Sequence, residues 1–184
     1  MICLLYAHPY PDRSRANRVL LAAVRDLPEL EIRPLYDLYP DFAIDVEAEQ
    51  AALTRARLIV FQHPFYWYGV PGLLKHWFDK VLSLGWAYGE CAALRGKTCL
   101  WVTTTGAPES GYTESGMHER PFSEFVPPIE QTARFCGMHW AEPRILHGAH
   151  RVGPDVLASH ADAYREQLLA LASPAGLAAP AIKD

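Results

Sequence analysis

Short apolar segments alternate with segments of helical period along most of the chain. Apolar or β-branched runs of strand length occupy residues 2–7, 30–35, 57–63, 97–105 and 144–148. Apolar side chains recur at helical spacing in residues 14–27, 46–55, 71–84, 122–136 and 155–171. Because a strand that returns parallel to its neighbour needs a crossover, usually a helix, this alternation predicts an α/β fold with helices on both faces of a parallel sheet. We expect a three-layer sandwich with five strands in the order 2-1-3-4-5.

The composition limits the class of protein to which the chain can belong. Its 184 residues, half of them hydrophobic, can bury the core of one domain, which we expect to span residues 1–172. Residues 173–184 are rich in Ala and Pro without an apolar period and are expected to form a flexible tail. The formal net charge of −4 supplies no basic field for nucleic acid, so no nucleic-acid partner is expected.

Signals for secretion, membrane insertion and metal binding are missing from the sequence. The opening MICLLYAH has no basic region or cleavage pattern, and no apolar run approaches the roughly 18 residues of a membrane helix. The cysteines form no CxxC pair and no spacing with His that suggests zinc; they are Cys3, Cys91, Cys99 and Cys136. We therefore expect reduced thiols, no metal site and a cytoplasmic location.

In a sheet of this order, ligands bind beyond the carboxyl ends of the strands, so the loops after strands 1, 3 and 4 are the expected site. The first of these is YAHPYPDRSRAN, residues 6–17. Ser14 or Asn17 can cap a helix whose first amides favour an anion, and Arg13 and Arg15 add positive charge there. A phosphate would fit, although an ordinary capped helix with solvated arginines is the alternative. His8 alone is typical of a hydrogen-bonded residue at a strand end.

The second loop, HPFYWYGVPG (residues 63–72), contains four consecutive aromatic residues: Phe65, Tyr66, Trp67 and Tyr68. A run of four leaves some of these side chains directed away from any single core surface. A flat ligand that stacks on them is one interpretation. A subunit interface, where Trp and Tyr are also favoured, is the other, and both hold if the pocket lies at a dimer contact.

The third loop is TTTGAPESGYTESGMH, residues 103–118. The hydroxyl groups of its threonines and the flexible backbone at Gly106 can hydrogen-bond the polar edge of a heterocycle. Tyr112 and His118 offer a phenol and an imidazole that could supply a proton or stabilise an anion. Loop tyrosines and histidines are more often ordinary surface residues. Together, however, an anion site, an aromatic surface and a polar edge match a mononucleotide with a flat ring, and flavin mononucleotide (FMN) fits this architecture.

Four segments carry a family resemblance: YAHPYPDRSRAN, LYPDFAID, QHPFYWYGVPGLLKHWFDKVLSLGWAYG and TTGAPES. They resemble the NAD(P)H:quinone oxidoreductase family of flavodoxin-like proteins, and most of all the ancillary flavoproteins of glutathione-regulated potassium-efflux systems. The resemblance extends from Met1 to about Leu171. It implies a flavodoxin-like fold, FMN as cofactor with FAD as an alternative, NAD(P)H as co-substrate and ping-pong transfer of electrons to a quinone.

The resemblance also implies roles for particular residues. The FMN phosphate would lie against His8, Ser14, Arg15, Ala16 and Asn17. The ribityl chain and the ring would lie along Phe65, Tyr66, Trp67 and Tyr68, and the polar edge of the ring would face Thr104, Thr105, Gly106 and Ala107. Tyr112 and His118 reproduce the family spacing of a tyrosine and a histidine that flank the flavin, so they are the expected catalytic residues.

This sequence departs from the family at Ala107 and Pro108, where many relatives have glycines. Pro108 has no N–H to donate, so the contacts at the ring edge are open to question. Two functions follow from the resemblance. One is a quinone oxidoreductase, expected to be a homodimer. The other is a regulatory subunit that docks on a potassium/proton antiporter at the inner face of the cell membrane. An electron-carrying flavodoxin is a third and weaker interpretation, since those proteins are commonly strongly acidic.

Overall fold

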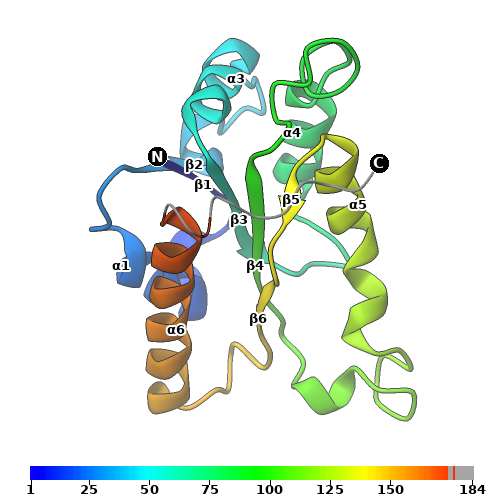
Figure 1. Cartoon of the computed structure of the whole chain (residues 1–184). Coiled ribbons are helices and arrows are strands. Elements are labelled where there is room, and N and C mark those ends of the chain that lie inside the picture. The colour runs from blue at the N-terminus through cyan, green and yellow to red at the C-terminus, as the bar shows by residue number, and fades with distance from the viewer. Residues whose placement is uncertain (174–175, 177–184) are drawn as a thin grey trace.

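Strands and helices alternate through the computed structural model, which describes residues 1–173 and residue 176 (Figure 1). The strands are β1 (Ile2–Tyr6), β2 (Leu30–Pro34), β3 (Leu58–Pro64), β4 (Thr98–Thr104), β5 (His139–Trp140) and β6 (Arg144–Leu146). The α-helices are α1 (Ala16–Val24), α2 (Leu35–Leu38), α3 (Val46–Arg55), α4 (Gly72–Val81), α5 (Pro127–Phe135) and α6 (Pro154–Ala172). Short 3-10 turns cover Pro11–Arg13, Glu109–Gly111 and Phe122–Phe125. Most of the tail expected at 173–184 lies outside the described residues.

All the strand pairs are parallel, and the strand order is β2-β1-β3-β4-β5, with β6 also paired to β4. The predicted order and fold class are therefore confirmed. The fifth position of the sheet is divided, because β5 pairs with the start of β4 and β6 with its end. Only β6 was predicted. Pro143 lies between the two pieces and has no N–H to give to the ladder, which accounts for the interruption.

The continuous apolar runs of the sequence correspond to the central strands. Every residue of β1, β3 and β4 is buried, whereas β2 is only partly buried because it lies at one edge of the sheet. Strands covered on both faces read as apolar runs without alternation, as these do. Because these strands and β6 run parallel, the carboxyl ends of β1, β3, β4 and β6 lie at one end of the sheet.

Helices cover both faces of the sheet, as a three-layer sandwich requires (Figure 1). On one face, Leu53 of α3, Trp77 of α4 and Ala133 of α5 belong to a single buried cluster. On the other face, Leu20 of α1 and Leu168 of α6 pack together with the strands, and α1 and α6 also contact each other. The amphipathic faces of these helices supply most of the buried apolar surface.

Helix boundaries differ from the sequence prediction where proline and the loops intervene. The helix expected over residues 122–136 is instead a 3-10 turn followed by α5, because Pro127 and Pro128 favour the first turn of a new helix. The first helix is shorter than the predicted 14–27, and α4 begins after Pro71, which is its N-cap. The short helix α2 was not predicted. None of the helices in the described part of the chain is long and apolar enough to cross a membrane.

Candidate functional site

Two adjoining cavities lie at the carboxyl ends of the strands. The first, named here the α1 cavity, has a volume of about 280 Å³ and is lined by His8, Tyr10, Arg13, Ser14, Arg15, Ala16, Asn17, Pro64, Phe65, Tyr66, Thr104, Thr105, Gly106, Ala149 and His150. The second, the aromatic cavity, has a volume of about 420 Å³ and is lined by Phe65, Trp67, Tyr68, Gly106, Ala107, Pro108, Tyr112, Met117, His118 and Arg151. Phe65 and Gly106 line both cavities, which therefore adjoin each other, and the two together are named the cleft. Every site residue expected from the sequence lines one of them.

The N-terminus of α1 faces the first cavity. The helix begins at Ala16, and no side chain caps it, so the prediction that Ser14 or Asn17 is the cap is wrong. Ser14 lies before Arg15, the N-cap residue, and the side chain of Asn17 turns towards Thr104. The first amides of a helix have no intrahelical acceptor and mark the positive end of its dipole. This end of α1 is therefore suited to an anion such as a phosphate.

Asn17 is fixed at the floor of the α1 cavity. Its Nδ2 donates to Oγ1 of Thr104 at 2.8 Å, and its backbone carbonyl accepts from Nε2 of Gln62 at 3.0 Å. Gln62 in turn accepts from the hydroxyl of Tyr164 on α6 at 3.2 Å. The Oδ1 atom of Asn17 is buried and has no protein partner among the described residues. A buried acceptor of this kind is costly unless a ligand or water donates to it.

His8 has a defined proton arrangement. Its Nδ1 accepts a hydrogen bond of 3.0 Å from the backbone N–H of Tyr10, so the hydrogen of the neutral ring is on Nε2. Burial lowers the pKa of His8, which favours this neutral form at pH 7. Its ring also lies edge-on to Tyr66, with 6.4 Å between the ring centroids. His8 can therefore offer an N–H donor within the α1 cavity.

The aromatic loop forms a tight hairpin turn. Tyr66 and Gly69 exchange both backbone hydrogen bonds, at 3.2 and 3.0 Å. The two central residues, Trp67 and Tyr68, have positive φ angles of 49° and 63°. Such turns normally contain Asn or Gly, and bulky residues in this region cost about 1–3 kcal/mol each. The turn directs Trp67 outwards, and this side chain is 95% exposed in the single chain.

Tyr112 and His118 form a stacked pair on one wall of the aromatic cavity. Their ring centroids are 4.3 Å apart with an interplanar angle of 18°. Nδ1 of His118 is 3.4 Å from the hydroxyl of Tyr68, and its buried Nε2 has no protein partner among the described residues. Burial raises the pKa of Tyr112, so its phenol keeps its proton at neutral pH.

The segment after β4 presents backbone donors. The amide of Thr105 is bonded to the carbonyl of Leu146 at 2.9 Å, whereas the amides of Gly106 and Ala107 have no protein acceptor in the part of the chain that the structure describes. Both residues line the cleft. Pro108 contributes no N–H, as its chemistry requires. Any backbone N–H that this segment offers to a ligand must therefore come from Gly106 and Ala107.

Sequence reasoning missed the residues that follow β6. Ala149, His150 and Arg151 line the cleft, and His147 contacts Thr105 and Tyr112 from behind the cavity wall. The signal was available, because β6 ends at the same edge of the sheet as β4. The prediction considered only the loops after strands 1, 3 and 4.

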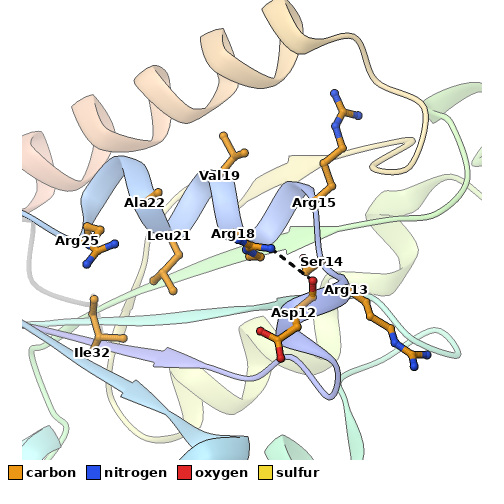
Figure 2. A pocket seen from close by; sticks show the side chains of 10 residues that line it. All are labelled: Asp12, Arg13, Ser14, Arg15, Arg18, Val19, Leu21, Ala22, Arg25 and Ile32. Carbon is orange, nitrogen blue, oxygen red and sulfur yellow. Dashed lines mark hydrogen bonds between the residues drawn. The ribbon is translucent and has the colours of Figure 1, made fainter.

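A larger hollow of about 790 Å³, the arginine groove, lies on the outer face of α1 and is shown in Figure 2. Its arginines are Arg13, Arg15, Arg18 and Arg25. In Figure 2 Arg15 points away from Arg18 and Arg25. Arg15 donates to the carbonyl of Val152 at 2.7 Å. The guanidinium groups do not converge on one point, so the groove lacks the arrangement of a built anion site.

No group of three His, Cys, Asp or Glu side chains within residues 1–173 and 176 is arranged to hold a metal ion. Cys3, Cys99 and Cys136 are buried as free thiols, and burial raises the pKa of each. Cys91 is exposed. The described side chains of the cleft offer an amide, hydroxyls, imidazoles, aromatic rings and the guanidinium groups of Arg13, Arg15 and Arg151.

Comparisons with known proteins agree with this architecture. The ancillary protein KefF of the glutathione-regulated potassium-efflux system of Salmonella newport (strain SL254) is 50% identical over 171 residues, which cover 92% of this chain and 96% of the relative. A structure from Streptomycin violaceusniger, described as a thermophilic tryptophan halogenase, has a TM-score of 0.86 with 40% identity and covers 92% of this chain and 98% of its own.

Two further structures are similar. General stress protein 14 from Treponema denticola, solved in complex with FMN, has a TM-score of 0.85 and 33% identity, with 92% of this chain and 98% of that chain covered. An NADPH-quinone reductase from P. pentosaceus has a TM-score of 0.83 and 28% identity, with 91% and 96% covered. The family model of the flavodoxin-like fold matches residues 1–171. The chain therefore belongs to the flavodoxin-like fold family.

Proposed function

We propose that this protein is an FMN-dependent NAD(P)H:quinone oxidoreductase. The similar structures are named for different activities, so we base the proposal on the residues of the cleft. The observation on which it rests is that the two cavities adjoin at Phe65 and Gly106: the N-terminus of α1 and His8 line the first, and Tyr112 and His118 line the second. An anionic phosphate and a flat ring, joined by a short chain, suit these two cavities.

The residues present fit FMN on features of this structure. Two buried polar atoms without a protein partner among the described residues, Oδ1 of Asn17 and Nε2 of His118, belong to residues that line the first and the second cavity. The amides of Gly106 and Ala107 and the Nε2–H of His8 add donors. We propose that Ser14, Arg15, Ala16 and Asn17 hold the phosphate with His8, and that Thr104 and Thr105 contribute to the floor beneath the ring. FMN is preferred to FAD because this cleft accounts for a single phosphate.

FMN held in the cleft would supply the chemistry of two-electron transfer from NAD(P)H to a quinone. The overall reaction consumes one proton, because NAD(P)H and a quinone yield NAD(P)⁺ and a hydroquinone only with one H⁺ from solvent. Tyr112 and His118 would hold that proton and stabilise negative charge next to the ring, as positioned donors do. The nicotinamide product would leave before the quinone enters, which gives ping-pong kinetics. Phe65 and Tyr68 would exclude water from the ring.

We also propose that the protein is a homodimer with its sites close to the interface. Large apolar side chains near the cleft are exposed in the single chain: Trp67 is 95% and Met117 75% exposed. Both line the aromatic cavity. Aromatic residues and Met are enriched at protein interfaces. A second copy placed over this loop would cover Trp67 and narrow the entrance for substrates.

A second proposal is a regulatory role, because the relatives at about half identity are named ancillary proteins of a potassium-efflux system. The chain would then dock on the cytoplasmic side of such a transporter. In this case the protein would be cytoplasmic and peripheral to the inner face of the membrane. The two functions do not exclude each other, because a protein that docks on a transporter can also carry out a reaction.

The first experiment is the visible absorption spectrum of the purified protein with FMN, titrated anaerobically with NADH or NADPH and then with a quinone. We expect a bound-flavin spectrum that bleaches with the nicotinamide and returns with the quinone. Absence of flavin binding would overturn the assignment of the cleft. Flavin that binds but resists reduction would instead favour the regulatory role.

A further inference from the structure

His147 follows β6 directly and stands behind the cleft. Its Nδ1 is 3.0 Å from Oγ1 of Thr105, whose own hydroxyl donates to the carbonyl of Ala107 at 2.7 Å. Because a threonine has one hydroxyl hydrogen, Thr105 accepts from His147, and the hydrogen of the neutral imidazole is on Nδ1. The three groups thus form a directed chain from imidazole to hydroxyl to backbone carbonyl.

Other hydrogen bonds join the same two segments, residues 105–107 and 147–149. The amide of Gly148 donates to the carbonyl of Ala107 at 2.8 Å, and the amide of Ala149 donates to the carbonyl of Thr105 at 2.9 Å. The carbonyl of Ala107 is therefore held by two donors. This leaves the amides of Gly106 and Ala107, which have no acceptor among the described protein groups, in a fixed position at the cleft.

The hydrogen bonds between residues 105–107 and 147–149 matter more because residue 108 is a proline. A proline cannot donate, so the peptide between Ala107 and Pro108 offers only its carbonyl, and that carbonyl is turned to Thr105 and Gly148. The two amides before it must provide all the backbone donors of this segment. Donors help a bound group most when they are held in place beforehand.

We propose that His147 is a positioning residue that acts through the hydroxyl of Thr105 to hold the amides of Gly106 and Ala107 towards a bound flavin ring. The proposal rests on the proposed function, because it concerns the same cleft. His147 itself lines another hollow, the α5 groove, with Tyr112, Phe122 and Trp140, and its ring lies 5.2 Å from that of Tyr112. His147 therefore contacts Tyr112 in the wall of the aromatic cavity but does not itself line the cleft.

The test measures the dissociation constant of FMN by quenching of flavin fluorescence. We expect His147→Ala to weaken binding up to about tenfold, the effect of one hydrogen bond. His147→Asn, whose amide can reproduce the Nδ1–H donor, should restore affinity to within about twofold, whereas His147→Gln places its amide at the Nε2 position and should not. The matched control is His139→Asn. His139 lies in β5 beside Thr98, at the end of β4 away from the cleft, so this change should leave the dissociation constant of FMN unchanged.

A double-mutant cycle with Thr105→Val separates positioning from general loss of structure. If His147 acts through Thr105, replacing His147 by Ala in the Thr105→Val background should cause no further loss of affinity. Melting of the apo-proteins reports any loss of fold. Additive losses, or an Asn variant as weak as the Ala variant, would overturn the proposal. Failure of the unaltered protein to bind FMN would instead overturn the proposed function.

Discussion

At the scale of single residues, the side chains of the cleft are oriented by bonds that the protein makes behind them. Asn17 is held by Thr104 and Gln62, and His8 by the amide of Tyr10. These bonds leave Oδ1 of Asn17 without a protein partner among the described residues and leave the Nε2–H of His8 as a donor. This arrangement explains why the polar groups here can contribute to binding without first being reorganised.

His118 is the residue whose loss should most directly affect the reaction. His118→Ala removes an imidazole whose buried Nε2 has no protein partner, but it leaves the N-terminus of α1 intact. We expect FMN to stay bound while flavin reduction or reoxidation slows about a hundredfold. Stopped-flow single-turnover measurements check this expectation. Unchanged rates would remove His118 from the mechanism.

Gly148 is required by its backbone conformation. Its φ angle is +65°, a region that costs a residue with a side chain about 1–2 kcal/mol. Gly148→Ala should lower the free energy of unfolding by that amount, measured by urea denaturation. Gly72→Ala is the control, because Gly72 is the first residue of α4, its φ lies outside this region and its Cβ position has open space around it. Equal stability of the two variants would contradict the argument.

At the scale of elements, a buried polar network joins β2, α2, α3 and α4. Glu49 of α3 is fully buried and accepts hydrogen bonds from Arg33, from the hydroxyl of Tyr39 at 2.6 Å and from Nε1 of Trp77 at 2.9 Å. These contacts fix how α3 and α4 sit against the edge strand. The network lies away from the cleft, so it concerns the fold and not the reaction.

Replacing Glu49 by Gln should therefore be strongly destabilising. The change removes the buried charge beside Arg33, which keeps the partly exposed Glu31 as a second partner, so the loss should approach but not exceed the cost of breaking a buried pair, about 3–5 kcal/mol. Glu47→Gln, on the exposed face of the same helix, should change stability little. Chemical denaturation of both variants measures the difference. A loss below about 1 kcal/mol for Glu49→Gln would show that the network contributes little net stability.

The elements also show what the sequence could and could not predict. The strands β1, β3 and β4 were predictable because full burial leaves a continuous apolar run. The division of the fifth strand was not, since β5 has only two residues and its pairing depends on long-range contacts. At the site, the loops after the first, third and fourth predicted strands were identified from their unusual composition. The loop after the fifth predicted strand could have been included, because that strand ends at the same edge of the sheet, but the contact of His147 with Thr105 exists only in the folded chain.

At the scale of the whole molecule, we expect the fully buried His63 and the partly buried His160 to lower stability in acid. His63 is fully buried between Nε1–H of Trp101 at 2.7 Å and the carbonyl of Pro64 at 2.9 Å. Burial lowers the pKa of His63 to about 4 and lowers that of His160 to about 4. Both rings are therefore neutral in the folded protein at pH 7.

The sign of the pH effect follows from these shifts. The unfolded chain takes up a proton on each histidine near pH 6.5, while the folded protein does so only near 4, so stability is complete above 6.5 and falls towards pH 4. For His63 the slope approaches about 1.4 kcal/mol per pH unit. Melting temperatures measured between pH 7.5 and 4.5 test this, and His63→Gln should flatten the decline. An equally steep decline in that variant would assign the loss to other groups.

The divided fifth strand has a consequence for the behaviour of the protein at high concentration. An open sheet has two edges, and a long unpaired edge is a template on which other chains can add and aggregate. Here one edge consists of β5 and β6, two short pieces separated by residues 141–143, which include Pro143. The opposite edge, β2, carries the charged side chains of Glu31 and Arg33 and ends in Pro34. Neither edge offers a foreign strand a long run of free backbone groups, so the fold resists adding further strands.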